Sequence, residues 1–287
     1  MVMMFGSLLT VSLVACMTSS DDRVNAPLEA GEDALPARVV SLAPAITQVA
    51  LQVRPDVIVG YDNYSERHQH RDRVTNVGDM RALAPEPILA LKPTLVLHNG
   101  GVRPPEVLQA VRAAGVSVVE IPHERSLDGV RTLIRETGKA LGADTEGVVA
   151  RFDASCVDLP DAPSPKPGAL FIYVRDNATM SMAGSGTAAH AMMTLAGLNN
   201  VLGDREGYTA ITAKPTLDAQ PDWLVFTTKG LGLAGGVEGL AGASALDEFN
   251  AVREGRVASV DDSQLLAFGL DTCEGVRALA RAVRRVP

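Results

Sequence analysis

The stretch RVVSLAPAITQVALQVRPDVIVGYD, residues 38–62, decides the fold of this 287-residue protein. The runs at 38–44 and 56–62 are short, apolar and rich in Val, which is typical of buried strands. The run between them, 45–53, has apolar residues at the spacing of an amphipathic helix. Strand, helix and strand in this order predict two parallel strands joined by a crossover helix.

The same alternation continues along the chain, with one interruption. We predict further strands in the runs 94–100, 116–122, 169–174, 223–230 and 256–262. We predict further helices in the runs 85–92, 104–115, 126–142, 144–159, 186–197, 245–252 and 273–285. The helix 144–159 has no strand before it, and the proline-rich PDAPSPKPG (160–168) follows it.

These patterns predict an α/β fold of two lobes with parallel-type sheets, joined by a single rigid helix. The N-terminal lobe spans 37–142 and the C-terminal lobe spans 166–287. The connecting segment, 143–165, holds the helix and the proline-rich break. A ligand cleft is expected between the lobes, because small molecules often bind at domain interfaces.

The N-terminus has the pattern of an export signal. Residues 1–16 are apolar and too few to span a bilayer. Their end, Leu13-Val14-Ala15-Cys16, resembles the bacterial lipobox, in which the cysteine is lipidated; a frayed apolar tail is the alternative. Residues 17–36 are polar and acidic, as in a flexible tether. We predict a protein of the cell envelope, lipid-anchored through Cys16 in the periplasm or on the outer face of the cytoplasmic membrane.

Charge and cysteine content narrow the function classes. The formal net charge is −8 and no basic run occurs, so nucleic acid is not expected as a partner. Cys156 and Cys273 have no CxxC or zinc-like spacing. We expect two lone buried thiols there, although a pairing in an oxidising compartment stays open.

Candidate ligand-binding residues follow the predicted strands, because ligands of open parallel sheets bind beyond the carboxyl ends of the strands. They are Tyr61, Tyr64, His98, His123, Arg175 and Thr228. Tyr, His and Arg suit a ligand that is large, aromatic, anionic or metal-bearing. His68 and His70, in the loop GYDNYSERHQH (60–70), are as readily explained as solvated surface residues.

An enzyme is not expected. The sequence has no GxSxG elbow, no HExxH and no Walker A loop. AGSGTAAHA (183–191) lacks the spacing and the lysine of a phosphate loop, and its residue His190 is expected to be packed. An α/β enzyme with a cofactor cysteine is the alternative, but neither cysteine lies at a strand end.

Several segments resemble the metal-chelate class of substrate-binding proteins of ABC importers, which carry haem, cobalamin and ferric siderophores. Residues 38–65 and PEPILALKPTLVL (85–97) are similar to the class in general. MAGSGTAAHAMMTLAGLNNVLGDREGYTAI, PDWLVFTTKGLGLAGGVEGLAG and FGLDTCEGVRALA look like its haem-binding, HmuT-type branch. The resemblance covers nearly the whole chain from Arg38. It implies a protein that binds haem and delivers it to a permease and ATPase for iron uptake, with cobalamin or a ferric siderophore as the alternative cargo.

The resemblance also implies site residues, with two departures. The branch typically reads VGY plus Arg where this chain reads VGDMR (77–81), so Asp79 replaces the expected iron-binding tyrosine. We therefore predict Tyr64 or His98 as the haem-iron ligand, with Arg81 and Arg175 pairing the propionates. Glu86 matches the acidic residue that docks on the permease in the first lobe. Lys214 reverses the charge of the second such residue, and Asp218 is a neighbouring substitute.

Overall fold

The computed structural model describes residues 35–65, 74–176, 179–211, 220–240, 246 and 249–284. The predicted signal peptide with Cys16, most of the tether, and the residues His68, His70, Lys214 and Asp218 lie outside these ranges. Within the ranges, no helix is both long enough and apolar enough to cross a membrane.

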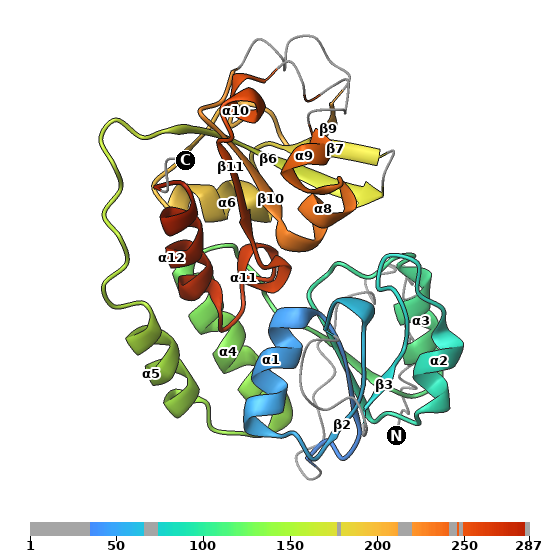
Figure 1. The fold of residues 1–287 in the computed structure, drawn as a ribbon. Helices are drawn as coiled ribbons and strands as arrows, with labels where there is room; N and C mark the ends of the chain where they lie inside the picture. The colour runs from blue at the N-terminus through green and yellow to red at the C-terminus, as the bar shows by residue number, and fades with distance from the viewer. Residues whose placement is uncertain are drawn as a thin grey trace, which may run out of the picture. The chain divides into compact units, whose positions relative to one another are not determined.

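The first lobe contains the parallel sheet that the sequence predicts (Figure 1). Its strands are β1 (Val39–Leu42), β2 (Ile58–Tyr61), β3 (Thr75–Asn76), β4 (Leu95–His98) and β5 (Ser117–Glu120). They lie in the order β3-β2-β1-β4-β5, and every neighbouring pair is parallel. The helices are α1 (Pro44–Val53), α2 (Pro85–Ala90) and α3 (Glu106–Ala113), and a 3-10 turn, η1, spans Asn63–Ser65. All carboxyl ends of these strands therefore lie at one edge.

The second lobe contains a mixed sheet rather than the parallel one predicted. Its strands are β6 (Gly168–Asp176), β7 (Thr179–Ala183), β8 (Asn199–Asn200), β9 (Tyr208–Ala210), β10 (Trp223–Thr227) and β11 (Val257–Val260). The order is β11-β10-β6-β7-β9, with β8 paired to β6. The β6–β7 and β7–β9 pairs are antiparallel, and the remaining pairs are parallel. β7 and β9 are short and rich in Thr, Ser and Ala, so no strong apolar run marks them in the sequence.

In the second lobe, helices begin close to their predicted positions at 188 and 272, whereas those that begin at 228, 236 and 262 were not predicted. The first of these unpredicted helices begins inside the run 223–230, which we predicted as a strand. The six helices that the structure describes in this lobe therefore agree with the prediction only in part. They are α6 (Ala188–Leu195), α8 (Thr228–Leu233), α9 (Gly236–Leu240), α10 (Asn250–Arg253), α11 (Asp262–Leu266) and α12 (Thr272–Ala282). The predicted helix 245–252 is reduced to the single turn of α10, and residues 245, 247 and 248 are not described. The two-lobed α/β fold is confirmed.

Two helices precede the second lobe. α4 (Leu127–Leu141) begins after Ser126, whose hydroxyl accepts a hydrogen bond from the Gly129 amide at 2.9 Å. It ends at Gly142, whose φ of 62° suits glycine. α5 (Glu146–Ser155) then packs against α4. Between α5 and β6 the chain forms no further helix.

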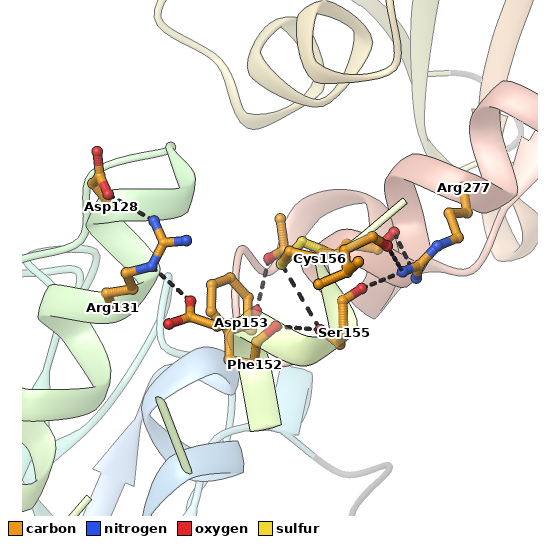
Figure 2. Close-up of a disulfide and its surroundings, with 11 residues drawn as sticks. Asp128, Arg131, Phe152, Asp153, Ser155, Cys156 and Arg277 are labelled. Carbon is orange, nitrogen blue, oxygen red and sulfur yellow. Dashed lines mark hydrogen bonds and ion pairs between the residues drawn. A yellow bond between two sulfur atoms is a disulfide. The ribbon is translucent and has the colours of Figure 1, made fainter. Parts of the chain in front are cut away.

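Cys156 and Cys273 form a disulfide, so the expectation of two lone thiols is wrong. The two Cα atoms lie 5.2 Å apart, although 117 residues separate them in sequence. Figure 2 shows Arg277 of α12 reaching the end of α5, where it donates hydrogen bonds to the carbonyls of Ser155 and Val157. The sequence could not reveal this pairing, because only the packing of the second lobe brings the start of α12 to the end of α5.

One apolar core extends through both lobes. Its buried members include Val39 and Ile46 near the first sheet, and Phe171, Val225 and Leu279 of the second lobe. Gln48 of α1 crosses between the lobes: its Nε2 donates to the Asp271 carboxylate at 3.1 Å, and its Oε1 accepts from the Leu270 amide at 2.8 Å. We call the disulfide, the Arg277 bonds and the Gln48 bonds the core-side contacts.

Candidate ligand-binding site

A cavity of about 780 Å³ is lined by residues of both lobes. The first lobe contributes the segments that follow its strands, and the second contributes β6, β7, β9, the start of α6 and residues of α11. The charged or aromatic side chains of the lining are Tyr64, Arg81, Arg103, His123, Arg125, Tyr173, Arg175, Tyr208 and Asp262. Three of the chain's four tyrosines therefore line one cavity, together with four arginine side chains.

Tyr64 is held at the cavity by the short turn η1. The buried carboxylate of Asp62 accepts hydrogen bonds from the Tyr64 amide at 2.7 Å and from the Ser65 hydroxyl at 3.2 Å. The Ser65 hydroxyl also bonds the hydroxyl of Thr47 on α1 at 3.0 Å. Burial raises the pKa of Asp62 to about 6, so its carboxyl is still ionised at neutral pH. A buried polar network thus fixes the backbone that carries Tyr64.

Backbone hydrogen bonds tie the three first-lobe loops together beside the cavity. The Asn63 amide donates to the Gly78 carbonyl at 2.9 Å, and the Arg103 amide donates to the Met80 carbonyl at 2.7 Å. The Leu83 amide returns a bond of 2.9 Å to the Arg103 carbonyl. This side of the cavity is therefore preformed in the ligand-free protein.

Arg81 lies at the centre of an aromatic cluster, which we define as Tyr64, Arg81, Tyr173 and Tyr208. Its guanidinium carbon lies 4.9 Å from the ring centre of Tyr64 and 5.9 Å from that of Tyr173. Its Nη1 donates to the Tyr173 hydroxyl at 3.1 Å, and the rings of Tyr173 and Tyr208 lie 5.8 Å apart. The guanidinium thus links the two lobes through side chains alone.

The tyrosines of this cluster differ in their hydrogen bonds. The Tyr64 hydroxyl donates to the Asp79 carboxylate at 3.2 Å, whereas the Tyr173 hydroxyl accepts from Arg81. Burial raises the pKa of Tyr64; Arg81 opposes this rise and Asp79 adds to it. Burial also raises the pKa of Tyr208. The carboxylate of Asp79 next to Tyr64 therefore disfavours the phenolate form of Tyr64.

His123 connects the lobes at another point of the cavity. Its Nδ1 lies 3.0 Å from the Asn99 amide nitrogen, and its Nε2 lies 3.1 Å from the Phe268 carbonyl. The carbonyl can only accept, so Nε2 carries the proton and Nδ1 accepts from Asn99. Burial lowers the pKa of His123, which favours this neutral form. Both ring nitrogens are therefore engaged within the protein.

The structure brings together four of the residues predicted from the sequence: Tyr64, Arg81, His123 and Arg175 line the cavity. Tyr61, His98 and Thr228 do not. Tyr61 packs in the shared core with 6 % of its surface exposed, and Thr228 is the exposed first residue of α8. The strand-end rule selects positions, but alternate residues of a strand face opposite sides of the sheet.

His98 is 2 % exposed, and burial lowers its pKa. Its Nδ1 accepts from the Gly100 amide at 3.0 Å, whereas its Nε2 has no partner among the residues that the structure describes. His98 is therefore buried next to Gly100 and is not part of the cavity lining.

Five charged or aromatic residues of the lining were not among the candidates: Tyr173 and Asp262 lie at the ends of predicted strands, whereas Arg103, Arg125 and Tyr208 lie outside the predicted strands. Arg103 and Arg125 lie a few residues beyond the ends of β4 and β5, so extending the strand-end rule into the loops would have found them. Tyr208 begins β9, which has no strong sequence pattern. In the described ranges, no group of three or more His, Cys, Asp or Glu residues is placed to hold a metal ion.

Comparisons with known proteins agree with this architecture. The sequence pattern of the periplasmic binding protein family matches residues 39–264. The structure is similar to that of the periplasmic haem-binding protein RhuT from Roseiflexus sp. RS-1 in apo form, with a TM-score of 0.79 and 33 % identity, covering 86 % of this chain and 97 % of that one. It is also similar to the periplasmic haem-binding protein BhuT in complex with two haems, with a TM-score of 0.77, 29 % identity and the same coverage.

A curated relative is the uncharacterized ABC transporter substrate-binding lipoprotein YvrC of Bacillus subtilis, 27 % identical over 257 residues, which are 86 % of this chain and 80 % of the relative. The resemblance seen in the sequence is confirmed, as is the prediction of a binding protein rather than an enzyme, because the relatives are transporter substrate-binding proteins. This chain belongs to the periplasmic binding protein family.

Proposed function

We propose that this ABC transporter substrate-binding protein carries haem in the cavity between its lobes. The observation that carries the proposal is the meeting of three tyrosines and four arginines in a cavity of about 780 Å³. Haem is a flat apolar macrocycle with a central iron and two carboxylates. Aromatic side chains suit its faces, a phenolate oxygen suits ferric iron, and guanidinium groups suit its carboxylates. The haem-binding relatives RhuT and BhuT support this cargo.

Tyr173 is the best-placed iron ligand in this proposal. Its side chain lines the cavity, and its hydroxyl accepts a hydrogen bond from Arg81 instead of donating one to a carboxylate. Tyr64, predicted from the sequence, donates a hydrogen bond to Asp79 and is the second candidate for the iron ligand. His98, also predicted, does not reach the cavity lining, and the ring nitrogens of His123 are already bonded.

Arg81 and Arg175 retain their predicted role as partners of the carboxylates, and Arg103 and Arg125 join them in the lining. An arginine holds a carboxylate through two parallel hydrogen bonds, and the cluster also attracts an anionic ligand over distance. The cavity thus offers positive charge for two carboxylates together with a phenol for the iron.

Delivery belongs to the same proposal. Lipidation of Cys16 would keep the protein at the membrane, with 17–36 as the tether. Glu86 is exposed in the first turn of α2, where it is available to an arginine of the permease. A single exposed ion pair contributes about 1 kcal/mol or less, so docking requires further contacts.

The proposal is tested by titrating residues 17–287 with ferric haem while absorbance is recorded, and in parallel with cyanocobalamin. We expect a saturable change of the haem spectrum in the unmodified protein. Tyr173→Phe should lose the spectrum of a phenolate-bound ferric haem, whereas Tyr64→Phe and His98→Ala, which serve as controls, should retain it.

Binding of cobalamin without any response to haem would reject haem as the cargo and retain the family. If neither haem nor cobalamin binds, ferric siderophores become the cargo to test. Loss of the phenolate spectrum in Tyr64→Phe rather than Tyr173→Phe would retain haem and move the ligand to the first lobe.

A further inference from the structure

Arg81 lines the cavity beside Tyr173, the proposed iron ligand. Its guanidinium carbon lies 4.9 Å from the ring centre of Tyr64 and 5.9 Å from that of Tyr173. Its Nη1 bonds the Tyr173 hydroxyl at 3.1 Å, so it occupies one approach to that oxygen. A planar macrocycle cannot stack in the same space while the guanidinium is there.

The base of the Arg81 side chain is fixed, whereas its contacts at the tip are easily exchanged. The Arg81 amide donates to the Asp79 side chain at 2.8 Å, and the loop is tied to Arg103 through Met80. The Asp79 carboxylate also accepts a hydrogen bond from the Tyr64 hydroxyl, so one carboxylate positions both the backbone of Arg81 and the ring of Tyr64. A cation over an aromatic ring and a hydrogen bond at a partly exposed site each contribute little, so a ligand can replace them.

We propose that Arg81 is a displaceable gate of the cavity. In the ligand-free protein its guanidinium bridges the lobes by bonding Tyr173. An entering planar anionic aromatic ligand breaks this bond, gains access to Tyr173, and takes over the guanidinium with one of its carboxylates. The inference deepens the proposed function and rests on it for the identity of the cargo. Arg81 thereby becomes a positioning residue that couples occupancy of the cavity to a bond between the lobes.

The other arginines of the cavity make different bonds and supply a matched control. Arg103 donates to the carbonyls of Gly100 and Val102 in its own loop, so it carries the same charge without bridging the lobes. Arg125 does cross between the lobes, but to the main-chain carbonyl of Gly186 at 2.9 Å, away from the tyrosine oxygens.

The first test measures the association rate of iron-free protoporphyrin IX by stopped-flow fluorescence. This probe has the shape and carboxylates of haem but contains no iron. Tyr173→Phe therefore removes the bond to Arg81 without also removing an iron ligand of the probe. The association rate should rise about two- to fivefold in Tyr173→Phe. Arg81→Ala should show the same rise when the rate is measured in about 1 M salt, which screens the loss of electrostatic steering. The control Arg103→Ala should show no rise. Unchanged or lower rates in both gate variants, with binding intact, would overturn the gate and leave the proposed function standing.

The second test needs no ligand. Amide hydrogen exchange of residues 79–83 should speed up in Arg81→Ala and in Tyr173→Phe, with no further increase in the double variant, because both changes remove one bond. Additive effects would show that the bond does not hold the loop and would overturn the proposal. If exchange behaves as expected and the porphyrin does not bind, the bridge stands and the proposed cargo fails.

Discussion

The two lobes are joined by two kinds of contact, and they differ in strength. The core-side contacts are the Gln48 bonds, which join the lobes directly, and the disulfide and the Arg277 bonds, which tie the second lobe to the connecting segment. They act together with the apolar core that both lobes share. The cavity-side bonds are single hydrogen bonds from Arg81, His123 and Arg125 to the second lobe. From this difference we expect the cavity-side bonds to break individually while the core-side contacts keep the lobes together.

Removing the disulfide tests the stronger half of this comparison and should have the largest effect. A bond closing a loop of 117 residues stabilises a chain by about 5 kcal/mol in the chain-entropy description. The double variant Cys156→Ser/Cys273→Ser should lose about that much free energy of unfolding, measured with a denaturant under oxidising conditions. A reductant should lower the stability of the unmodified protein and leave the variant unchanged. A loss below about 1 kcal/mol would place the main constraint in the core alone.

Gly269→Ala tests the core-side contacts without altering the disulfide. An added Cβ would overlap the Oε1 atom of Gln48 and lie 3.1 Å from the Ala45 Cα, so α1 would have to shift from the second lobe. Overpacking of this kind costs about 2 kcal/mol. Gly232→Ala is the matched control, because nothing lies within 4 Å of its added Cβ on the exposed surface of α8. Equal thermal stability of the two variants would contradict the tight approach of α1.

Acidification tests the weaker, cavity-side half and should have the smallest effect. Burial lowers the pKa of His123 in the folded protein, so between that value and about 6.5 the unfolded chain binds the extra proton. Stability is therefore present above pH about 6.5 and is lost as the pH falls. The unmodified protein should lose about 1 kcal/mol relative to His123→Gln when denaturant unfolding is compared between neutral and mildly acidic pH. Parallel pH profiles of the two proteins would show that His123 does not titrate in this range.

The predictable part of the site followed from local rules, and its limits are equally physical. Tyr64, Arg81, His123 and Arg175 were found because they follow strands or match a family motif. His98 ends strand β4, yet its side chain is buried and does not line the cavity. The direction of a single side chain depends on register and on the neighbours that close over it, which strand-end counting does not include.

The roles within the cavity were still less accessible from the sequence. Asp79 was seen only as a missing tyrosine, whereas the structure makes it the acceptor of Tyr64 and the anchor of Arg81. Tyr173 and Tyr208 come together through an antiparallel pairing of β7 with β6 and β9. Such pairing joins short segments that are distant in sequence. The stability of each strand depends on contacts with its neighbours, so it cannot be seen in the sequence of one segment alone.

The sequence by itself determined the alternation of strands and helices, the two lobes, the parallel first sheet and the ends of α4. These follow from periodicity, capping and punctuation within a few residues of each other. Only the tertiary structure decided the disulfide, the mixed second sheet, the shared core and the placement of Arg81 next to Tyr64 and Tyr173. Each of these depends on residues far apart in the chain, and the free energy that joins them arises only when both partners are already packed.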